Sequence, residues 1–160
     1  MLFTNARRWL PGLLAVLAAL SSQTAVRAEE RQITVVAVLA TDKNTQVDPR
    51  VKSIAEEVQK IEPGLTGFRV ARTTSKGIAV GARETFPLVD NEVLAVVIQQ
   101  AGGGKEKEKD DRVRLAVKAP LAGEITYTTC CSKFFPIMTR YLTKDNERLT
   151  IAIMCKPKKQ

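Results

Sequence analysis

From Leu65 onward, apolar side chains recur at every second position, and this period of two is the strongest constraint on the fold. Such alternation is typical of strands, and clusters of turn-forming residues divide it into short segments. The dividing stretches are TTSKG, VDN, APLAG and TKDNE. The predicted strands are residues 67–73, 77–88, 92–100, 112–118, 124–131, 134–143 and 148–156. Consecutive short strands of this kind indicate a largely antiparallel meander.

The segment before Leu65 predicts one further strand and one helix. Residues 32–40, QITVVAVLA, are uncharged and rich in β-branched side chains, which indicates a strand buried on both faces. Asp48 is a natural N-cap, Pro49 suits the first helical position, and Pro63 with Gly64 ends the helical segment. Five apolar residues at helical spacing share one face of this helix: Val51, Ile54, Ala55, Val58 and Ile61.

Together these elements predict one α+β domain over residues 29–160. One amphipathic helix is expected to pack on a largely antiparallel meander sheet, or on a small sandwich, of about seven to eight strands. The stretch AGGGKEKEKDD, residues 101–111, has alternating charges and no apolar face, so it predicts a mobile charged loop within that domain.

Residues 1–28 have the pattern of an export signal. Arg7 and Arg8 provide a positive start, the stretch WLPGLLAVLAAL is apolar, and VRA supplies a small-residue cleavage pattern. The apolar run is shorter than the roughly 20 residues that a membrane-spanning helix needs. We therefore expect cleavage after Ala28 and a secreted or periplasmic mature protein without a membrane span. An uncleaved membrane anchor is the alternative.

Charge and composition restrict the classes of partner. The formal charge of the whole chain is +8, and loss of the three arginines of the signal lowers it to +5. This moderate basicity favours an anionic envelope polymer or a protein as the partner. Specific nucleic-acid binding is disfavoured, because the basic residues lie among acids and lack interleaved aromatic side chains.

The adjacent cysteines of ITYTTCCSKFF lie in a predicted strand, where successive side chains point to opposite faces. Cys131 shares the apolar side with Ile125 and Tyr127, and Cys155 lies on the apolar side of the last predicted strand. Cys131 and Cys155 are therefore the candidate disulfide, with Cys130 turned away. An exported protein meets an oxidising compartment, although buried free thiols are the alternative.

Several catalytic and metal chemistries lack their residues. The chain has no histidine and no CxxC motif, so we expect no zinc site, no histidine-activated nucleophile and no cofactor. Asp42, Asn44, Gln46 and Asp48 alternate like calcium ligands, but the glycine and the glutamate of that loop are missing. The loop between the first strand and the helix remains the best place for a ligand, although Asp48 itself fills the helix N-terminus.

Two stretches carry resemblances. The pattern VVAVLATD, VDPRVKSIAEEVQKI and FRV, followed by a β-rich half, resembles short exported bacterial proteins of unknown function. QQAGG, residues 99–103, resembles the hairpin loop of cystatin-like inhibitors, with alanine where that pattern prefers valine. The second resemblance implies a fold with a helix packed on an antiparallel sheet, and inhibition of a thiol protease by this loop. The charged insertion that follows the loop departs from that family.

These observations predict an exported, non-catalytic binding or structural protein of the bacterial cell envelope. A secreted protease inhibitor and a carboxylate-based hydrolase are the alternatives. An exposed sheet edge and the basic tail KPKK, residues 156–159, are the expected contact regions. The candidate contact residues are Lys156, Lys158, Lys159, Gln99 and Gly103.

Overall fold

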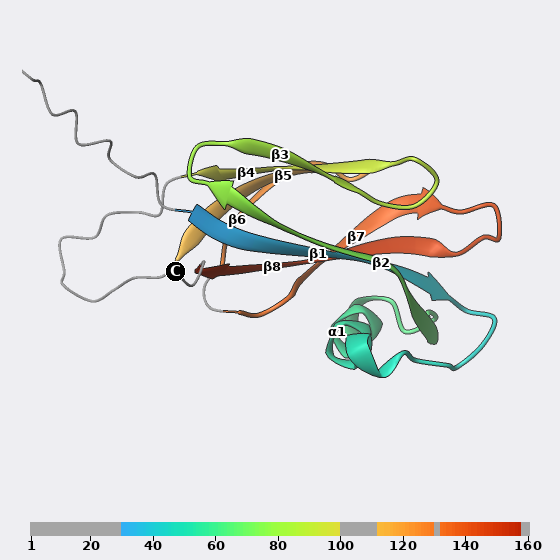
Figure 1. The fold of residues 1–160 in the computed structure, drawn as a ribbon. Coiled ribbons are helices and arrows are strands. Elements are labelled where there is room, and N and C mark those ends of the chain that lie inside the picture. The colour runs from blue at the N-terminus through green and yellow to red at the C-terminus, as the bar shows by residue number, and fades with distance from the viewer. Residues whose placement is uncertain (1–29, 100–111, 130–131, 158–160) are drawn as a thin grey trace, which may run out of the picture.

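A computed structural model of the chain describes residues 30–99, 112–129 and 132–157 (Figure 1). These residues form two four-stranded antiparallel sheets and one short helical segment. Sheet A has the strand order β2-β1-β8-β7, and sheet B has the order β3-β4-β5-β6. The elements in chain order are β1 (Glu30–Thr41), η1 (Pro49–Val51), α1 (Lys52–Ile61), β2 (Gly67–Ala79), β3 (Arg83–Pro87), β4 (Val93–Gln99), β5 (Val113–Ala119), β6 (Gly123–Thr129), β7 (Phe135–Leu142) and β8 (Arg148–Pro157).

Strand β1 lies in the middle of sheet A and is buried on both faces, as its sequence predicts. It pairs with β2 on one side and with β8 on the other. Ile33, Val35 and Leu39 face the core between the two sheets, whereas Val36 and Val38 face the core under the helix. An uncharged, β-branched sequence suits this position because every residue from Val35 to Thr41 is buried.

The core between the sheets is built from alternate residues of the strands on both sides. Sheet B contributes fully buried side chains from three neighbouring strands: Phe86, Leu94, Val96, Ile98, Leu115 and Val117. Sheet A contributes alternate residues of its two central strands: Ile33, Val35, Ala37, Leu39, Leu149, Ile151 and Ile153. Apolar burial on this scale is the main stabilising term of the sandwich.

The helix covers the outer face of sheet A, on the side of the sandwich away from sheet B (Figure 1). The helical segment begins with the 3₁₀ turn η1, and Asp48 accepts a hydrogen bond from the backbone N–H of Arg50. Four of the five predicted apolar positions are buried: Val51, Ile54, Ala55 and Val58. Ile61 is the exception and is 69% exposed, because α1 ends there.

The predicted antiparallel strands and the amphipathic helix are confirmed, but a single continuous meander is wrong. Strands β3 to β6 form a meander in sheet B, whereas sheet A combines the pairs β1–β2 and β7–β8, so the chain changes sheet between β2 and β3 and again between β6 and β7. Strand β8 then returns to pair with β1, the first strand described. The sandwich alternative is therefore the one that matches the structure.

The predicted break at TTSKG, residues 73–77, is also wrong. Strand β2 continues through this stretch because the long strand β1 offers it a partner, with Thr73 opposite Val36 and Ser75 opposite Thr34. The hydroxyl groups of Thr34 and Ser75 lie 2.8 Å apart in a hydrogen bond. The chain turns instead at Gly81, whose φ of +86° suits glycine.

Thr150 has a buried hydroxyl in the core under the helix, and replacing it tests how this core is packed. It is fully buried, and its Oγ1 has no hydrogen-bond partner among the described residues. Because an unsatisfied buried hydroxyl costs about 1–3 kcal/mol, Thr150→Val should raise the free energy of unfolding by about 1 kcal/mol in urea denaturation.

Thr139→Val is the matched control for this prediction. The Thr139 hydroxyl is also buried, but it donates to the Leu149 carbonyl at 2.7 Å and accepts from the Tyr141 N–H at 3.1 Å. Its loss should destabilise the protein by about 1–3 kcal/mol. Changes of the same sign in both variants would contradict the assignment of the orphan hydroxyl.

None of the helices within residues 30–99, 112–129 and 132–157 combines the length and the apolar character needed to cross a membrane.

Candidate functional site

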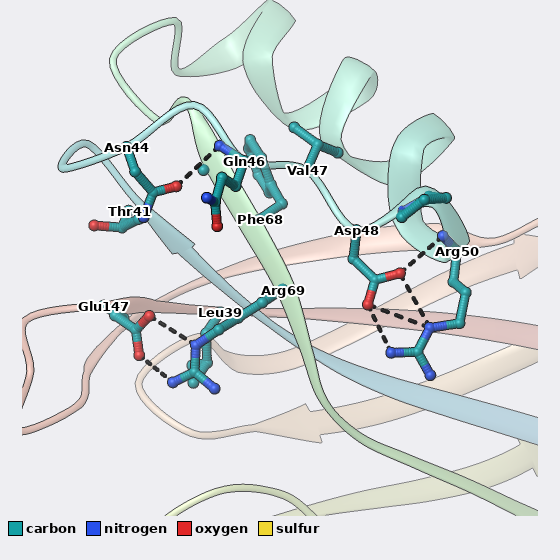
Figure 2. A pocket seen from close by; sticks show the side chains of 12 residues that line it. Leu39, Thr41, Asn44, Gln46, Val47, Asp48, Arg50, Phe68, Arg69 and Glu147 are labelled. Atoms are coloured by element: carbon teal, nitrogen blue, oxygen red, sulfur yellow. Dashed lines mark hydrogen bonds and ion pairs between the residues drawn. The ribbon is translucent and has the colours of Figure 1, made fainter.

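The loop between β1 and η1 borders a cavity of about 430 Å³ at one end of the sandwich (Figure 2). We call this cavity the loop hollow. It lies beside the strand-to-helix loop that the sequence analysis favoured for a ligand. Its lining residues come from β1, this loop, β2 and the turn before β8: Leu39, Thr41, Asn44, Gln46, Val47, Asp48, Pro49, Arg50, Gly67, Phe68, Arg69 and Glu147.

The loop is fixed in place because it pairs with the free edge of β2. The Phe68 N–H donates to the Gln46 carbonyl at 2.8 Å, and the Asp48 N–H donates to the Phe68 carbonyl at 2.9 Å. Val47 thereby forms an isolated parallel bridge with Phe68. This short pairing satisfies part of an exposed sheet edge and sets the positions of Gln46 and Asp48 at the hollow.

Asp48 and Arg50 form one wall of the loop hollow. The Asp48 carboxylate accepts from the Arg50 backbone N–H at 3.0 Å and from the Arg50 Nη2 at 2.6 Å. The Arg50 hydrogen bonds lower the pKa of Asp48 to about 2, and a further backbone hydrogen bond from Val70 acts in the same direction. The Asp48 carboxylate therefore already accepts a hydrogen bond from the backbone amide at the start of the helical segment.

Arg69 and Glu147 form another wall, on a different side of the hollow (Figure 2). The Arg69 Nε donates to Glu147 Oε1 at 2.9 Å, and its Nη2 donates to Oε2, which makes a bidentate pair. This pairing lowers the pKa of Glu147. The Glu147 side chain is only 14% exposed, whereas the Arg69 side chain is 56% exposed. The carboxylate is thus the buried partner, and the guanidinium faces the hollow.

Gly67 leaves space for the side chain of Asn44, which lies on a third side of the loop hollow. The Asn44 Oδ1 accepts from the Gln46 N–H at 3.0 Å, and the Asn44 carbonyl accepts from the Thr66 hydroxyl at 2.5 Å. A Cβ on residue 67 would collide with Asn44 Oδ1 and lie 2.9 Å from Thr41 Cγ2. Glycine is therefore required here for close packing of the loop against β2.

A second and larger space, of about 800 Å³, adjoins the loop hollow, and we call it the end recess. The β3–β4 turn and the β7–β8 turn border it, and it shares Leu39, Arg69 and Glu147 with the loop hollow. The Arg69–Glu147 pair therefore stands between the two spaces.

Side-chain hydrogen bonds connect the three loops around these spaces. The Tyr141 hydroxyl donates to Asp90 Oδ2 at 3.0 Å, which links β7 to the β3–β4 turn. The Lys43 Nζ donates to the Asp145 carbonyl at 2.8 Å, which links the β1–η1 loop to the β7–β8 turn. Segments distant in sequence are thus held together before any ligand arrives, which lowers the ordering cost of binding.

The lining of the loop hollow is polar and apolar in about equal parts, and its ionised residues have no excess of charge. Two arginines face two carboxylates, and each arginine leaves its Nη1 without a partner among the described residues. The side chains of Asn44 and Gln46 add amide donors and acceptors. This arrangement can receive a ligand that has both hydrogen-bond donors and acceptors and little net charge. Across the described ranges, no three acidic or cysteine side chains come together as metal ligands.

The two ion pairs predict loss of stability in acid. The folded-state pKa of Asp48 and that of Glu147 lie below their usual values, so the stabilisation is complete above about pH 4.5 and is lost as the pH falls towards 2. Urea midpoints measured between pH 7 and pH 2 should fall over this interval. The fall should be smaller in Asp48→Asn and in Glu147→Gln.

Glu56→Gln is the control for the acid prediction. Glu56 is exposed on α1 and makes no ion pair within the described part of the chain, so its replacement should leave the acid profile unchanged. An equal flattening of the profile in all three variants would show that general charge repulsion, and not the two ion pairs, governs the acid response.

The structure places the sequence-predicted residues at different parts of the molecule. Asp48 lines the loop hollow, together with Asn44 and Gln46 of the alternating polar residues in the same loop. Gln99 is exposed at the end of β4, and Lys156 is exposed near the end of β8. Gly103, Lys158, Lys159 and the loop of residues 101–111 lie outside the described residues. Nothing brings the described contact candidates together at one site.

The cysteine pairing stays a prediction, because Cys130 and Cys131 lie outside the described residues. Cys155 is buried in β8, and the N–H of Ser132, which follows Cys131 in the chain, donates to the Cys155 carbonyl at 3.4 Å. Peptide mapping without reductant should recover a linked pair, and two unlinked peptides would contradict it.

Sequence reasoning missed Arg69 and Glu147 as site residues, whereas it had named Asn44 only as one of the alternating polar residues of the loop. Arg69 and Glu147 meet only because β2 and the turn before β8 lie at the same end of sheet A. Comparison with family models, with curated proteins and with solved structures gives no match. The geometry of the site is therefore the basis for a functional proposal.

Proposed function

We propose that this chain is an exported, non-catalytic binding protein of the bacterial cell envelope, and that the loop hollow and the end recess receive a polar segment of a partner protein. The observation that carries the proposal is the set of hydrogen bonds that joins three loops around two adjoining spaces. Preformed concave sites with a few fixed polar groups are typical of ligand binding.

The chemistry of the walls favours a peptide segment over a small ion. Both carboxylates are already paired with arginines, and the remaining N–H and amide groups match the donors and acceptors of a polypeptide backbone. The two spaces, of about 430 and about 800 Å³, meet at the Arg69–Glu147 pair, which suits an extended ligand lying across both. The exposed guanidinium of Arg69 would then contact the segment near its middle.

The alternatives receive less support. A carboxylate-based hydrolase needs a carboxyl group with a raised pKa as its proton donor, whereas the pKa values of Asp48 and Glu147 are lowered. Of the cystatin-like stretch, residues 99–103, only Gln99 lies in the described part of the chain. The paired sheets also differ from the helix on one antiparallel sheet that this resemblance implies.

Site-specific photo-crosslinking in the producing cell tests the proposal. A benzoylphenylalanine residue at position 46, on the loop hollow, should give a discrete protease-sensitive adduct. The same residue at position 57, on the exposed face of α1, should not. Adducts of equal yield at both positions, or none at position 46, would refute the proposed site.

Two variants give this experiment a structural control. Gly67→Ala should displace Asn44 and reduce the adduct at position 46 severalfold, because the added Cβ needs the space that Asn44 Oδ1 occupies. Gly64→Ala is the matched control, because a Cβ there meets no atom within 4 Å. Circular dichroism should show both variants folded.

Export is tested separately from binding. Protein recovered from the envelope or from the medium should have Glu29 as its first residue, by intact mass and N-terminal sequencing. Recovery only from the cytosol with Met1 or Leu2 at the N-terminus would contradict export and leave the crosslinking result to be judged independently.

A further inference from the structure

The outer face of sheet B has no helix over it among the described residues. Helix α1 lies on the outer face of sheet A, at the opposite side of the sandwich (Figure 1). Leu94, Val96 and Ile98 of β4 point into the core, so the alternate residues of the same strand point outward. The outward residues of β3 to β6 therefore form a solvent-facing surface, which we call the open face.

Three unpaired cations lie on the open face: Arg83 on β3, and Arg114 and Lys118 on β5. All three are exposed, and none has an ion pair or a side-chain hydrogen bond within the described residues. Arg50, Arg69 and Arg148, in contrast, each pair with a carboxylate. The open face thus has positive charge that the protein itself leaves unneutralised.

The acidic residues do not cancel this charge. Glu124 lies opposite Lys118 on β6 and is the one acidic side chain on the open face among the described residues. Three cations and one anion leave this face with a formal charge of +2. The signal-free chain as a whole is also basic. An anionic partner is therefore favoured electrostatically at this surface.

The centre of the open face is flat and made of small residues. Ala95 and Ala116 are only 9% and 7% exposed although they point towards solvent. Neighbouring side chains shield them, since Arg83, Lys118 and Glu124 border a shallow groove of about 140 Å³ with these alanines in its lining. Long basic side chains cover apolar surface with their stems while their charged ends stay in water.

Exposed apolar side chains lie at one end of the same sheet. Val93 begins β4 and is 52% exposed, and Leu121 in the β5–β6 turn is 67% exposed. The Ala122 N–H donates to the Ala119 carbonyl across this turn, and Leu121 has a φ of 50°. A positive φ is uncommon for leucine, and glycine or asparagine would suit the turn better. Large apolar side chains presented at a turn often mark an interaction site.

We propose that the open face docks on a membrane surface rich in anionic phospholipid, with Arg83, Arg114 and Lys118 on the headgroups and Leu121 at the interface. Cations near an anionic bilayer and apolar side chains at its boundary contribute together to peripheral binding. A soluble polyanion would account for the cations but not for the exposed leucine. This surface uses other residues than the proposed peptide site, since Arg83, Arg114, Lys118 and Leu121 line neither the loop hollow nor the end recess, although Val93 borders the recess.

Vesicle co-sedimentation tests this assignment. The purified protein should bind vesicles of mixed phosphatidylcholine and phosphatidylglycerol and dissociate from them at high salt. It should not bind vesicles of pure phosphatidylcholine. The triple variant Arg83→Gln, Arg114→Gln, Lys118→Gln should lower the partition coefficient by about tenfold or more. The control triple variant Lys52→Gln, Lys133→Gln, Arg140→Gln removes the same charge from exposed positions elsewhere and should change it less than about threefold.

Leu121 has its own pair of variants. Leu121→Asn removes the apolar side chain and suits the positive φ, so it should fold and weaken vesicle binding by about threefold or more. Leu121→Met retains an apolar side chain and should bind like the parent protein.

Three outcomes would overturn the proposal. The two triple variants could lose binding equally, or pure phosphatidylcholine vesicles could bind as well as the anionic ones. The third is retention of the parent protein by soluble polygalacturonate without any vesicle binding, which would assign the open face to an acidic polysaccharide.

Discussion

Replacing Phe86 with alanine is expected to lower the free energy of unfolding by about 3–5 kcal/mol. Phe86 is fully buried between the sheets and belongs to the edge strand β3. Its ring also lies 5.4 Å from the Lys76 Nζ, a cation–π contact that the substitution would remove. The expected loss is large because a short edge strand cannot shift far to fill the cavity. Urea denaturation at neutral pH measures it.

Phe135→Ala is the matched control for Phe86→Ala. Phe135 also lies on an edge strand, but it is 40% exposed and stacks on Tyr127 with the ring centroids 4.2 Å apart. Its loss should cost about 1–2 kcal/mol, mainly from the aromatic contact. Equal destabilisation by the two substitutions would contradict the assignment of Phe86 to the core between the sheets.

Replacing Ile54 with alanine is expected to cost about 2–4 kcal/mol. Ile54 is 2% exposed and packs from α1 onto the outer face of sheet A, in the cluster that contains Val38 and Phe68. Loss of this contact loosens the helical segment and, with it, the Asp48–Arg50 wall of the loop hollow. The substitution should therefore reduce the crosslink at position 46 as well as the urea midpoint.

Ile61→Ala in the same helix provides the comparison. Ile61 is 69% exposed, so its truncation should change the free energy of unfolding by less than about 0.5 kcal/mol. If Ile54→Ala and Ile61→Ala lowered the free energy of unfolding equally, α1 would not be packed on sheet A as described. Both residues are isoleucines of α1, so the two variants differ mainly in how deeply the replaced side chain is buried.

Local patterns predicted the elements of this fold better than their arrangement. The β-branched run of residues 32–40 required two buried faces, and β1 indeed separates the two cores. Asp48 and Pro49 indicated the start of the helical segment, where Asp48 accepts the Arg50 N–H. These features depend on neighbouring residues, so a single sequence contains the necessary information.

Features that depend on distant partners were missed. Turn-forming residues at TTSKG suggested a break, but pairing with β1 overrides that local preference. The division into two sheets follows from the two points where the chain changes sheet, and period-two alternation looks the same in one sheet or two. The Arg69–Glu147 pair joins residues 78 positions apart, and nothing in either local sequence marks it.

The pairing of β1 with β8 has a consequence for the timing of folding. Sheet A is completed by the first and the last strands described, so a growing chain cannot close it until β8, residues 148–157, has been synthesised. Such long-range closure is slow compared with local hairpin formation. Until the final strand emerges, β1 would expose an apolar ribbon to chaperones or to a translocation channel. For the export that we propose, this delay would help to keep the chain unfolded during transit.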